Sequence, residues 1–120
     1  MTPAPQKSAP HREQTGPRHQ IHINITGNGF LYTRPDGQNA ATIVVRKGDV
    51  VTWRCDHGNF SVLFKLNSPF ALVGFHGRRG TETVEALVVG ERGSYHYATT
   101  VSLDSGLIVD DPEIIVDDGD

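Results

Sequence analysis

Hydrophobic and polar positions alternate along this chain in short stretches, and no segment shows convincing helical periodicity. Ile21, Ile23 and Ile25 alternate with polar neighbours, which is the two-residue period of a half-buried strand. A Gly-Asn-Gly sequence at 27–29 then interrupts the pattern. Six further strands, rich in Val, Ile and aromatic residues, are expected at 42–46, 49–55, 60–66, 83–89, 94–99 and 113–117.

Two of the expected strands indicate which residues face a core. Val51, Trp53 and Cys55 form one apolar face, while Thr52 and Arg54 turn the other way. Several short strands punctuated by turns predict an all-β, antiparallel sandwich whose two sheets bury alternate residues. In the strand at 60–66, the apolar side consists of Phe60, Val62, Phe64 and Leu66.

The composition fits one globular domain. The chain has 120 residues, of which 37% are hydrophobic and 21% charged. The single cysteine, Cys55, has no partner for an internal disulfide. Residues 1–18 contain four prolines and almost nothing apolar, so we expect a disordered arm there and a folded domain over 19–120.

Charge and hydropathy limit the classes of partner. The formal net charge is −3, but six of the 14 acidic residues lie between Asp110 and Asp120, and the basic residues elsewhere are scattered. We therefore expect no nucleic-acid partner. No apolar run approaches the roughly 20 residues that span a bilayer, so we expect no membrane insertion. We also expect a monomer. The location is cytoplasmic if Met1 is the native start, and periplasmic or exported if a signal peptide was removed.

Three segments carry a family resemblance. Val-Val-Arg-Lys-Gly-Asp-Val-Val-Thr-Trp at 44–53 combines two strands with a tight turn in which Gly48 can take a positive φ. Asn-Phe-Ser-Val-Leu-Phe follows at 59–64, and Gly-Ser-Tyr-His-Tyr-Ala-Thr at 93–99. In order and spacing these segments resemble the cupredoxin (plastocyanin/azurin-like) family. The resemblance implies a Greek-key β-sandwich in which Tyr95 is an anchor, with its ring in the core and its hydroxyl bonded to the backbone.

The resemblance also argues against the usual function of that family. It places Phe60 where the first ligand histidine would lie, Thr99 at the thiolate cysteine, Ser102 near the second histidine and Leu107 at the axial methionine. Type 1 copper needs a Cys thiolate and two imidazoles. The resemblance therefore implies a degenerate member with no type 1 copper site, no cofactor and no electron-transfer role.

The glycine-rich segment 70–80 is the strongest candidate for recognition. It joins aromatic residues to an arginine pair, and such side chains often anchor partners. Phe75, His76, Arg78 and Arg79 are the candidate binding residues for a protein partner. In the alternative interpretation the segment is a crossover whose aromatic rings fill the core, while its arginines remain solvated.

Metal and enzyme chemistry have weaker support. Cys55 and His57 form a Cys-x-His pair, to which His76 and His96 are possible additional donors, but nothing in the sequence brings the four together. No nucleophile, base and oxyanion arrangement is recognisable, so we expect no enzyme. The interpretation is a copper-free, non-catalytic binding module; the alternative is a copper-binding or electron-transfer protein with a rearranged site.

Overall fold

The structure of the chain, a computed structural model, describes residues 16–117, and these form ten β-strands and no helix. None of the described residues forms a helix long and apolar enough to cross a membrane. Most of the expected N-terminal arm lies outside the described residues, while Arg18 is the first residue of β1. The strands are β1 (Arg18–Thr26), β2 (Gly29–Thr33), β3 (Thr42–Val45), β4 (Val50–Cys55), β5 (Phe60–Phe64), β6 (Gly74–Gly77), β7 (Ala86–Leu87), β8 (Gly93–Leu103), β9 (Gly106–Asp110) and β10 (Glu113–Val116).

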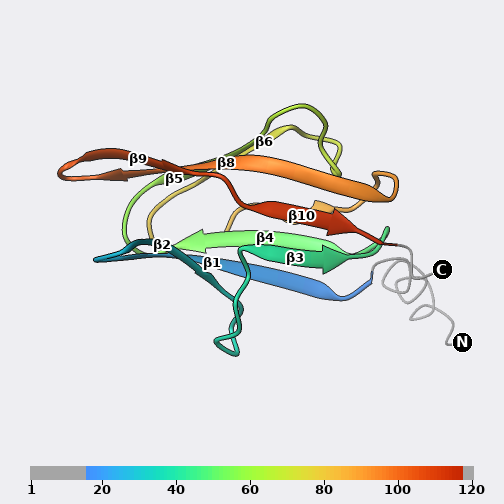
Figure 1. The fold of residues 1–120 in the computed structure, drawn as a ribbon, viewed down its shortest axis with the longest axis horizontal. Helices are drawn as coiled ribbons and strands as arrows, with labels where there is room; N and C mark the ends of the chain where they lie inside the picture. Colours follow the sequence, from blue (N-terminus) through green and yellow to red (C-terminus); the bar gives the residue numbers. More distant parts are fainter. Residues whose placement is uncertain (1–15, 118–120) are drawn as a thin grey trace, which may run out of the picture.

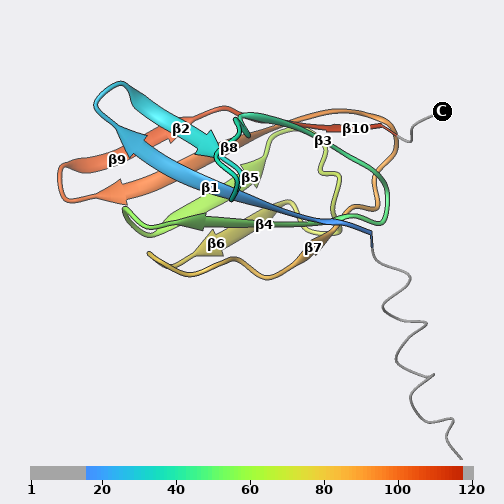
Figure 2. The same ribbon diagram turned by 90° about the horizontal axis from the view of Figure 1, so that it is seen from below.

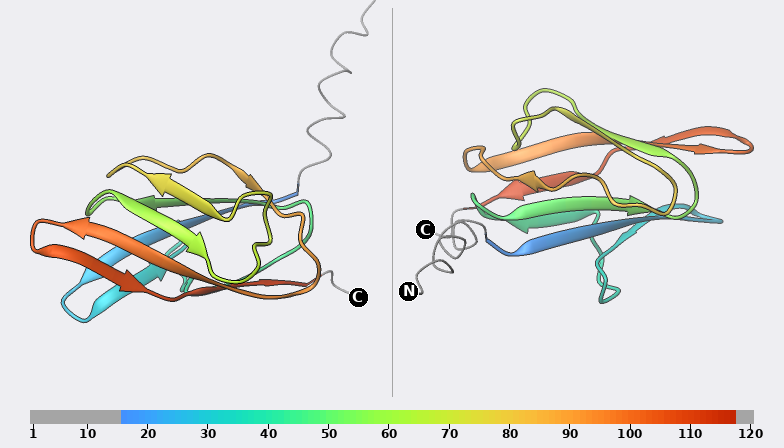
Figure 3. Two further views of the ribbon diagram at one scale, coloured as in Figure 1. Left: turned by 90° about the horizontal axis from the view of Figure 1, so that it is seen from above. Right: turned by 180° about the vertical axis from the view of Figure 1, so that it is seen from behind.

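The strands form two sheets that face each other (Figure 1). One sheet has the order β2-β1-β4-β7, and the other has the order β3-β10-β8-β5-β6, with β9 also paired to β8. The prediction of an all-β fold is confirmed, and the layering is compatible with a sandwich (Figures 2 and 3). The expectation of purely antiparallel sheets was wrong, because β1 pairs with β4 and β3 with β10 in parallel. Both parallel pairs join strands distant in sequence, which alternation within one strand does not reveal.

The parallel pairing of β1 and β4 aligns the apolar faces that the sequence indicated. Ile21 lies opposite Trp53 and Ile23 opposite Cys55, and all four side chains are buried. Because side chains alternate along a strand, this register leaves the polar residues of both strands on the outer face of the sheet. That outer face carries one of the candidate sites described below.

Three strands were missing from the sequence interpretation, and one was shorter than expected. β2 continues from β1 through a hairpin in which Gly29 takes a φ of +114°. The glycines at both ends of β6 concealed that strand, and in β9 the hydrophobic residues Leu107 and Val109 point to solvent. Only Ala86–Leu87 of the expected strand 83–89 is paired as a strand.

Two side chains differ from their expected positions. Leu66 was expected in the core but is 94% exposed, because β5 ends at Phe64 and the chain bends ahead of the Ser68–Pro69 turn. Thr52 does turn away from the core, yet it is fully buried. Its hydroxyl donates to Oε2 of Glu82, 3.2 Å away in the segment before β7. The segment before β7 therefore covers part of the outer face of β4.

Trp53 lies at the centre of an aromatic cluster between the sheets. Its indole Nε1–H donates to the hydroxyl of Tyr97, 3.2 Å away in the opposite sheet. The rings packed around it have centroids 5.4 to 6.4 Å from its own. Such edge and tilted contacts stabilise beyond their buried area. The cluster consists of Trp53, Phe64, Phe70, Phe75 and Tyr97.

Two local predictions are met in part or in full. Gly48 has a φ of +97° in the turn before β4, as expected. The hydroxyl of Tyr95 donates to the backbone carbonyl of Glu91 at 2.6 Å. Its ring is only partly buried, however, whereas Tyr32 and Tyr97 are buried in the core.

We expect the two buried tyrosine hydroxyls to differ in their effect on stability. Tyr97→Phe removes the acceptor of the buried Trp53 N–H and should lower the free energy of unfolding by about 1–3 kcal/mol. Tyr32→Phe removes a buried hydroxyl that makes no well-formed hydrogen bond among residues 16–117, so it should be neutral or stabilising. Urea denaturation at neutral pH measures both values. Equal losses in the two variants would contradict this assignment.

Alkaline pH should destabilise the fold. Burial raises the pKa of Tyr97 and of Tyr32 far above the ordinary value, and Thr99, Asp110 and neighbouring groups modify the shift at Tyr32. Above about pH 10 the unfolded chain releases these protons while the folded chain retains them, so stability falls by about 1.4 kcal/mol per pH unit for each tyrosine. Denaturation midpoints measured across this range should fall less steeply in Tyr32→Phe than in the parent; identical slopes would contradict the prediction.

Candidate functional site

The four residues that the cupredoxin resemblance assigns to copper-ligand positions divide between the core and the surface. The Phe60 ring is buried and packs directly over Gly77, where an added Cβ would overlap it. Thr99 is buried in β8, and its hydroxyl makes no well-formed hydrogen bond within the described part of the chain. Ser102 and Leu107 are opposite each other in the β8–β9 hairpin and are both exposed. The first two side chains thus pack in the core and the other two lie at the surface, so the four do not form a set of donors around one centre.

The alternative metal ligands are also dispersed. Cys55 is buried at the end of β4, and His57 is exposed in the turn that follows. His76 lies opposite Ser61 on β6, whereas His96 lies on β8 with its Nε2 3.6 Å from Glu113 Oε2. Within residues 16–117, no three metal-ligating side chains are close enough together to hold an ion.

The segment 70–80 separates into a buried part and an exposed part. Phe70 and Phe75 lie in the core against Trp53, as in the crossover interpretation. His76, Arg78 and Arg79 are exposed. Residues 74–77 form the edge strand β6, which pairs with β5, so His76 belongs to the sheet, while Arg78 and Arg79 lie in the turn that follows it. Phe75 is thus a core residue, and only the polar members of the predicted set are available at the surface.

Arg79 is held in place by the neighbouring β4–β5 turn. Its backbone N–H donates to Asn59 Oδ1 at 2.9 Å, and its Nε donates to the backbone carbonyl of Asp56 at 3.0 Å. Arg79 lines a polar hollow of about 350 Å³ at this end of the fold. We call this the loop-end hollow; it is lined by His57, Gly58, Asn59, Arg79, Ser102, Leu103 and Asp104.

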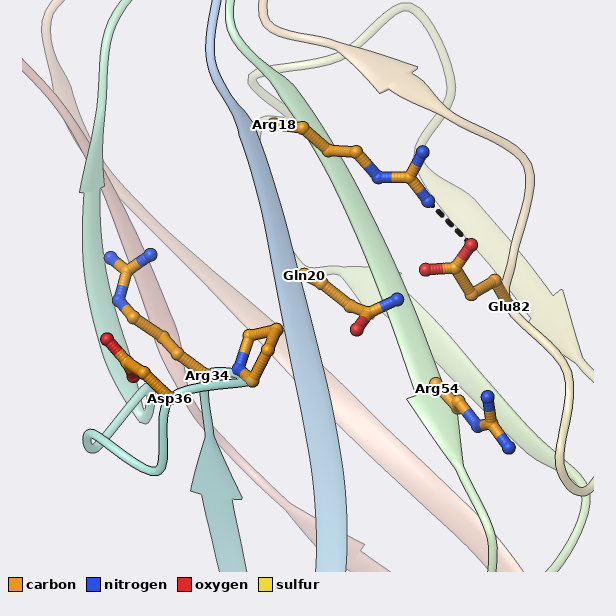
Figure 4. A pocket seen from close by; sticks show the side chains of 7 residues that line it. Arg18, Gln20, Arg34, Asp36, Arg54 and Glu82 are labelled. Carbon is orange, nitrogen blue, oxygen red and sulfur yellow. Dashed lines mark hydrogen bonds and ion pairs between the residues drawn. The ribbon is translucent and has the colours of Figure 1, made fainter.

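A larger groove lies on the outer face of the β2-β1-β4-β7 sheet, and sequence reasoning missed it. It has a volume of about 720 Å³ and opens to solvent (Figure 4). We call it the arginine groove; it is lined by Arg18, Gln20, Arg34, Pro35, Asp36, Arg54 and Glu82. The polar face of 49–55 signalled Arg54, whereas Arg18 lies in the arm expected at 1–18 and Arg34 lies outside every expected strand. The parallel register of β1 and β4 brings Arg18 and Arg54 to one surface, and the loop after β2 adds Arg34.

Two arginines of the groove are paired with carboxylates. Arg18 contacts Glu82 at 2.6 Å and Glu85 at 3.0 Å, and the hydrogen bond with Glu82 is the main reason that its pKa is raised. Arg54 Nε donates to Asp56 at 2.9 Å, and this bond lowers the pKa of the Asp56 carboxyl. Most of the charge of these two guanidinium groups is therefore balanced within the protein.

Arg34 is held differently. Its Nη1 donates to Nδ1 of His19 at 3.3 Å, and Nε2 of His19 is 2.8 Å from Asp49 Oδ2. His19 therefore lies between the Arg34 guanidinium and the Asp49 carboxylate and connects the two. Asp49 is buried and also accepts the backbone N–H of Arg46. Arg34 thus has a fixed neighbour but no carboxylate partner among residues 16–117.

No protein-family model and no curated protein matches the chain.

The packing of Phe60 over Gly77 can be tested directly. Gly77→Ala should lower the free energy of unfolding by about 1–3 kcal/mol, because the buried ring must move to admit the methyl group. Gly27→Ala is the matched control, since a Cβ there meets no atom within 4 Å, and it should change stability by no more than about 0.5 kcal/mol. In a Phe60→Leu background the cost of Gly77→Ala should shrink. An undiminished cost there would exclude the ring as its cause.

Proposed function

We propose that this chain is a non-catalytic protein-interaction module on a cupredoxin-like Greek-key β-sandwich, in which hydrophobic packing replaces the type 1 copper site. Its interaction surface consists of His76, Arg78 and Arg79 together with the loop-end hollow. Each part of this proposal has separate support from the described residues.

The strand order supports the finer topology. The chain passes from β3 in one sheet to β4 in the other and returns to the first sheet with β5. It crosses twice more, through β7 and β8. Repeated crossing between two facing sheets, with sequence-distant strands side by side, is typical of Greek-key sandwiches.

The side chains at the ligand positions support a copper-free role. A phenyl ring offers no electron pair to a metal, and the Phe60 ring is fixed by the neighbouring backbone of β6. The hydroxyl of Thr99 is a poor substitute for a thiolate in a blue-copper site. These side chains instead stabilise the end of the fold that presents the hollow.

One observation carries the assignment of the interaction surface: Arg79 of an exposed arginine pair is anchored to the turn between β4 and β5. Its backbone N–H donates to Asn59 and its Nε donates to Asp56, while the guanidinium of Arg78 beside it is exposed with no partner among residues 16–117. A pre-organised arginine loses little conformational freedom when a partner binds, so its hydrogen bonds contribute more to affinity. Arginine is also among the residues most often found to dominate binding energy at protein interfaces.

Charge-matched double variants test this surface. Arg78→Ala with Arg79→Ala removes the arginine pair, whereas Arg46→Ala with Lys47→Ala removes two exposed cations from the turn before β4. In affinity capture from the source cells, at least one partner should be lost with the first variant and kept with the second. The proposal is wrong if every captured protein persists with the first variant, or if the parent captures none.

A further inference from the structure

We propose that the free edge of β6 binds an extended segment of a partner protein as an added antiparallel strand, with a large apolar side chain opposite Gly74 and a carboxylate beside Arg78. This inference rests on the proposed function, because it names the kind of partner that the Arg78/Arg79 surface takes. Three features of β6 lead to it: its unpaired backbone groups, the gap at Gly74 and the arginine that follows the strand.

The backbone of β6 has one free side. This strand is the last of its sheet, and β5 is its one partner among the described strands (Figure 1). Phe64 N donates to Val73 O at 2.7 Å where the pairing begins, and hydrogen-bonded positions alternate along an antiparallel ladder. Phe75 therefore turns its N–H and C=O groups toward β5, whereas Gly74 and His76 turn theirs toward the free edge.

The other side of β5 supports the same alternation. Lys65 N donates to His96 O of β8 at 3.2 Å. At the opposite end of the strand, Ser102 N of β8 donates to Asn59 O at 2.9 Å. Odd-numbered positions along β5 thus bond to β8, which leaves the even-numbered positions for β6. The edge of β6 accordingly offers alternating donors and acceptors to a further strand.

The chain leaves this layer as soon as β6 ends. Gly80 N donates to Cys55 O at 2.8 Å. Thr83 N then donates to Trp53 O at 2.9 Å, so the segment after β6 pairs with β4 in the facing sheet. His76 on the edge strand is exposed. The edge of β6 is therefore open to strand addition, which is a recurrent mode of peptide recognition.

Gly74 leaves a gap on the outer face of the sheet, beside exposed apolar side chains. It lies opposite Leu63 of β5, and a Cβ at Gly74 would be 3.3 Å from Cδ1 of Leu63. Leu63 is 55% exposed, and Leu72 just before the strand is 56% exposed. Because Gly74 has no side chain, a long apolar side chain on the added strand can extend across it and cover Leu63.

The charge near β6 favours an acidic residue in the added strand. Arg78 follows β6 directly, and its exposed guanidinium has no partner among residues 16–117. Residues 57–81 contain no acidic side chain. The nearest acidic residues along the chain, Asp56 and Glu82, are each paired with another arginine. A carboxylate at the start of an antiparallel strand would lie beside Arg78 and match its forked N–H groups.

Fluorescence anisotropy with the full chain tests the strand addition. The probe is the fluorescein-labelled, C-terminally amidated peptide Glu-Thr-Thr-Thr-Leu-Thr-Val, whose Glu lies beside Arg78 when its Leu is opposite Gly74. N-methylation of that Leu blocks an N–H facing β6 and should weaken binding by about tenfold or more. N-methylation of the Thr before it, whose N–H faces solvent, should change affinity by less than about twofold.

Two variants at one position test the edge of the protein. Gly74→Pro removes an N–H at the free edge but none that bonds to β5, and it should weaken binding of the peptide by about tenfold or more. Gly74→Ala retains that N–H and should keep the affinity within about threefold. The urea midpoints of both variants should stay close to that of the parent. The methylated peptides provide a test on the unaltered protein.

A double-mutant cycle tests the charged contact. Glu→Gln in the peptide and Arg78→Gln in the protein should each weaken binding by about two- to fivefold, as expected for an exposed ion pair. The two changes together should weaken it no further than either alone. Arg46→Gln removes an exposed cation from the turn before β4 and should leave the affinity within about twofold.

The outcomes separate this inference from the proposed function. No binding by the parent, or equal losses with the two methylated peptides, would overturn the strand site. If the Arg78/Arg79 double variant loses a captured partner that Gly74→Pro retains, the partner binds without adding a strand, and this inference alone is wrong. If the peptides behave as expected while the double variant loses no captured protein, the strand site stands and the proposed function is wrong.

Discussion

The hydrogen bond between Trp53 and Tyr97 joins the two sheets at the centre of the molecule. Every other ring of the aromatic cluster packs against Trp53, and the bond satisfies the one polar atom that this large side chain brings into the core. A buried indole without an acceptor would incur a desolvation cost comparable to a large core mutation. The separation and alignment of the sheets therefore depend on these two residues, and the outer surfaces depend on that alignment.

The sequence predicted what alternation can encode and missed what pairing creates. The buried faces of β1 and β4 followed from a two-residue period, and Ile21, Ile23 and Trp53 lie where that period placed them. The parallel pairing of β1 with β4 joins residues more than thirty positions apart, and no local signal carries it. β9 was missed because Leu107 and Val109 face solvent, so its hydrophobic residues do not mark a buried face.

The candidate sites also differ in whether a local sequence signal or the pairing of distant strands creates them. Arg78 and Arg79 were recognisable because they are adjacent in sequence and follow glycine, although Phe75 proved to be part of the core. The arginine groove has no such motif, because Arg18, Arg34 and Arg54 meet only through sheet register and one protruding loop. The two surfaces are linked through Asp56, whose carboxylate accepts from Arg54 and whose carbonyl accepts from Arg79. A partner that displaced Arg79 would therefore act on the residue that neutralises Arg54.

The position of β10 also governs how the chain can be made. This strand lies between β3 and β8, and its residues are synthesised after those of the other nine described strands. Until they leave the ribosome, β3 has no neighbour and its apolar residues Ile43 and Val45 have no sheet to complete. Contacts of such long range also slow folding, because the entropy of closing the loop is lost before the pairing is gained. The nascent chain consequently carries an open sheet edge until the last of the described strands has been made, and such an edge is prone to pair with other chains.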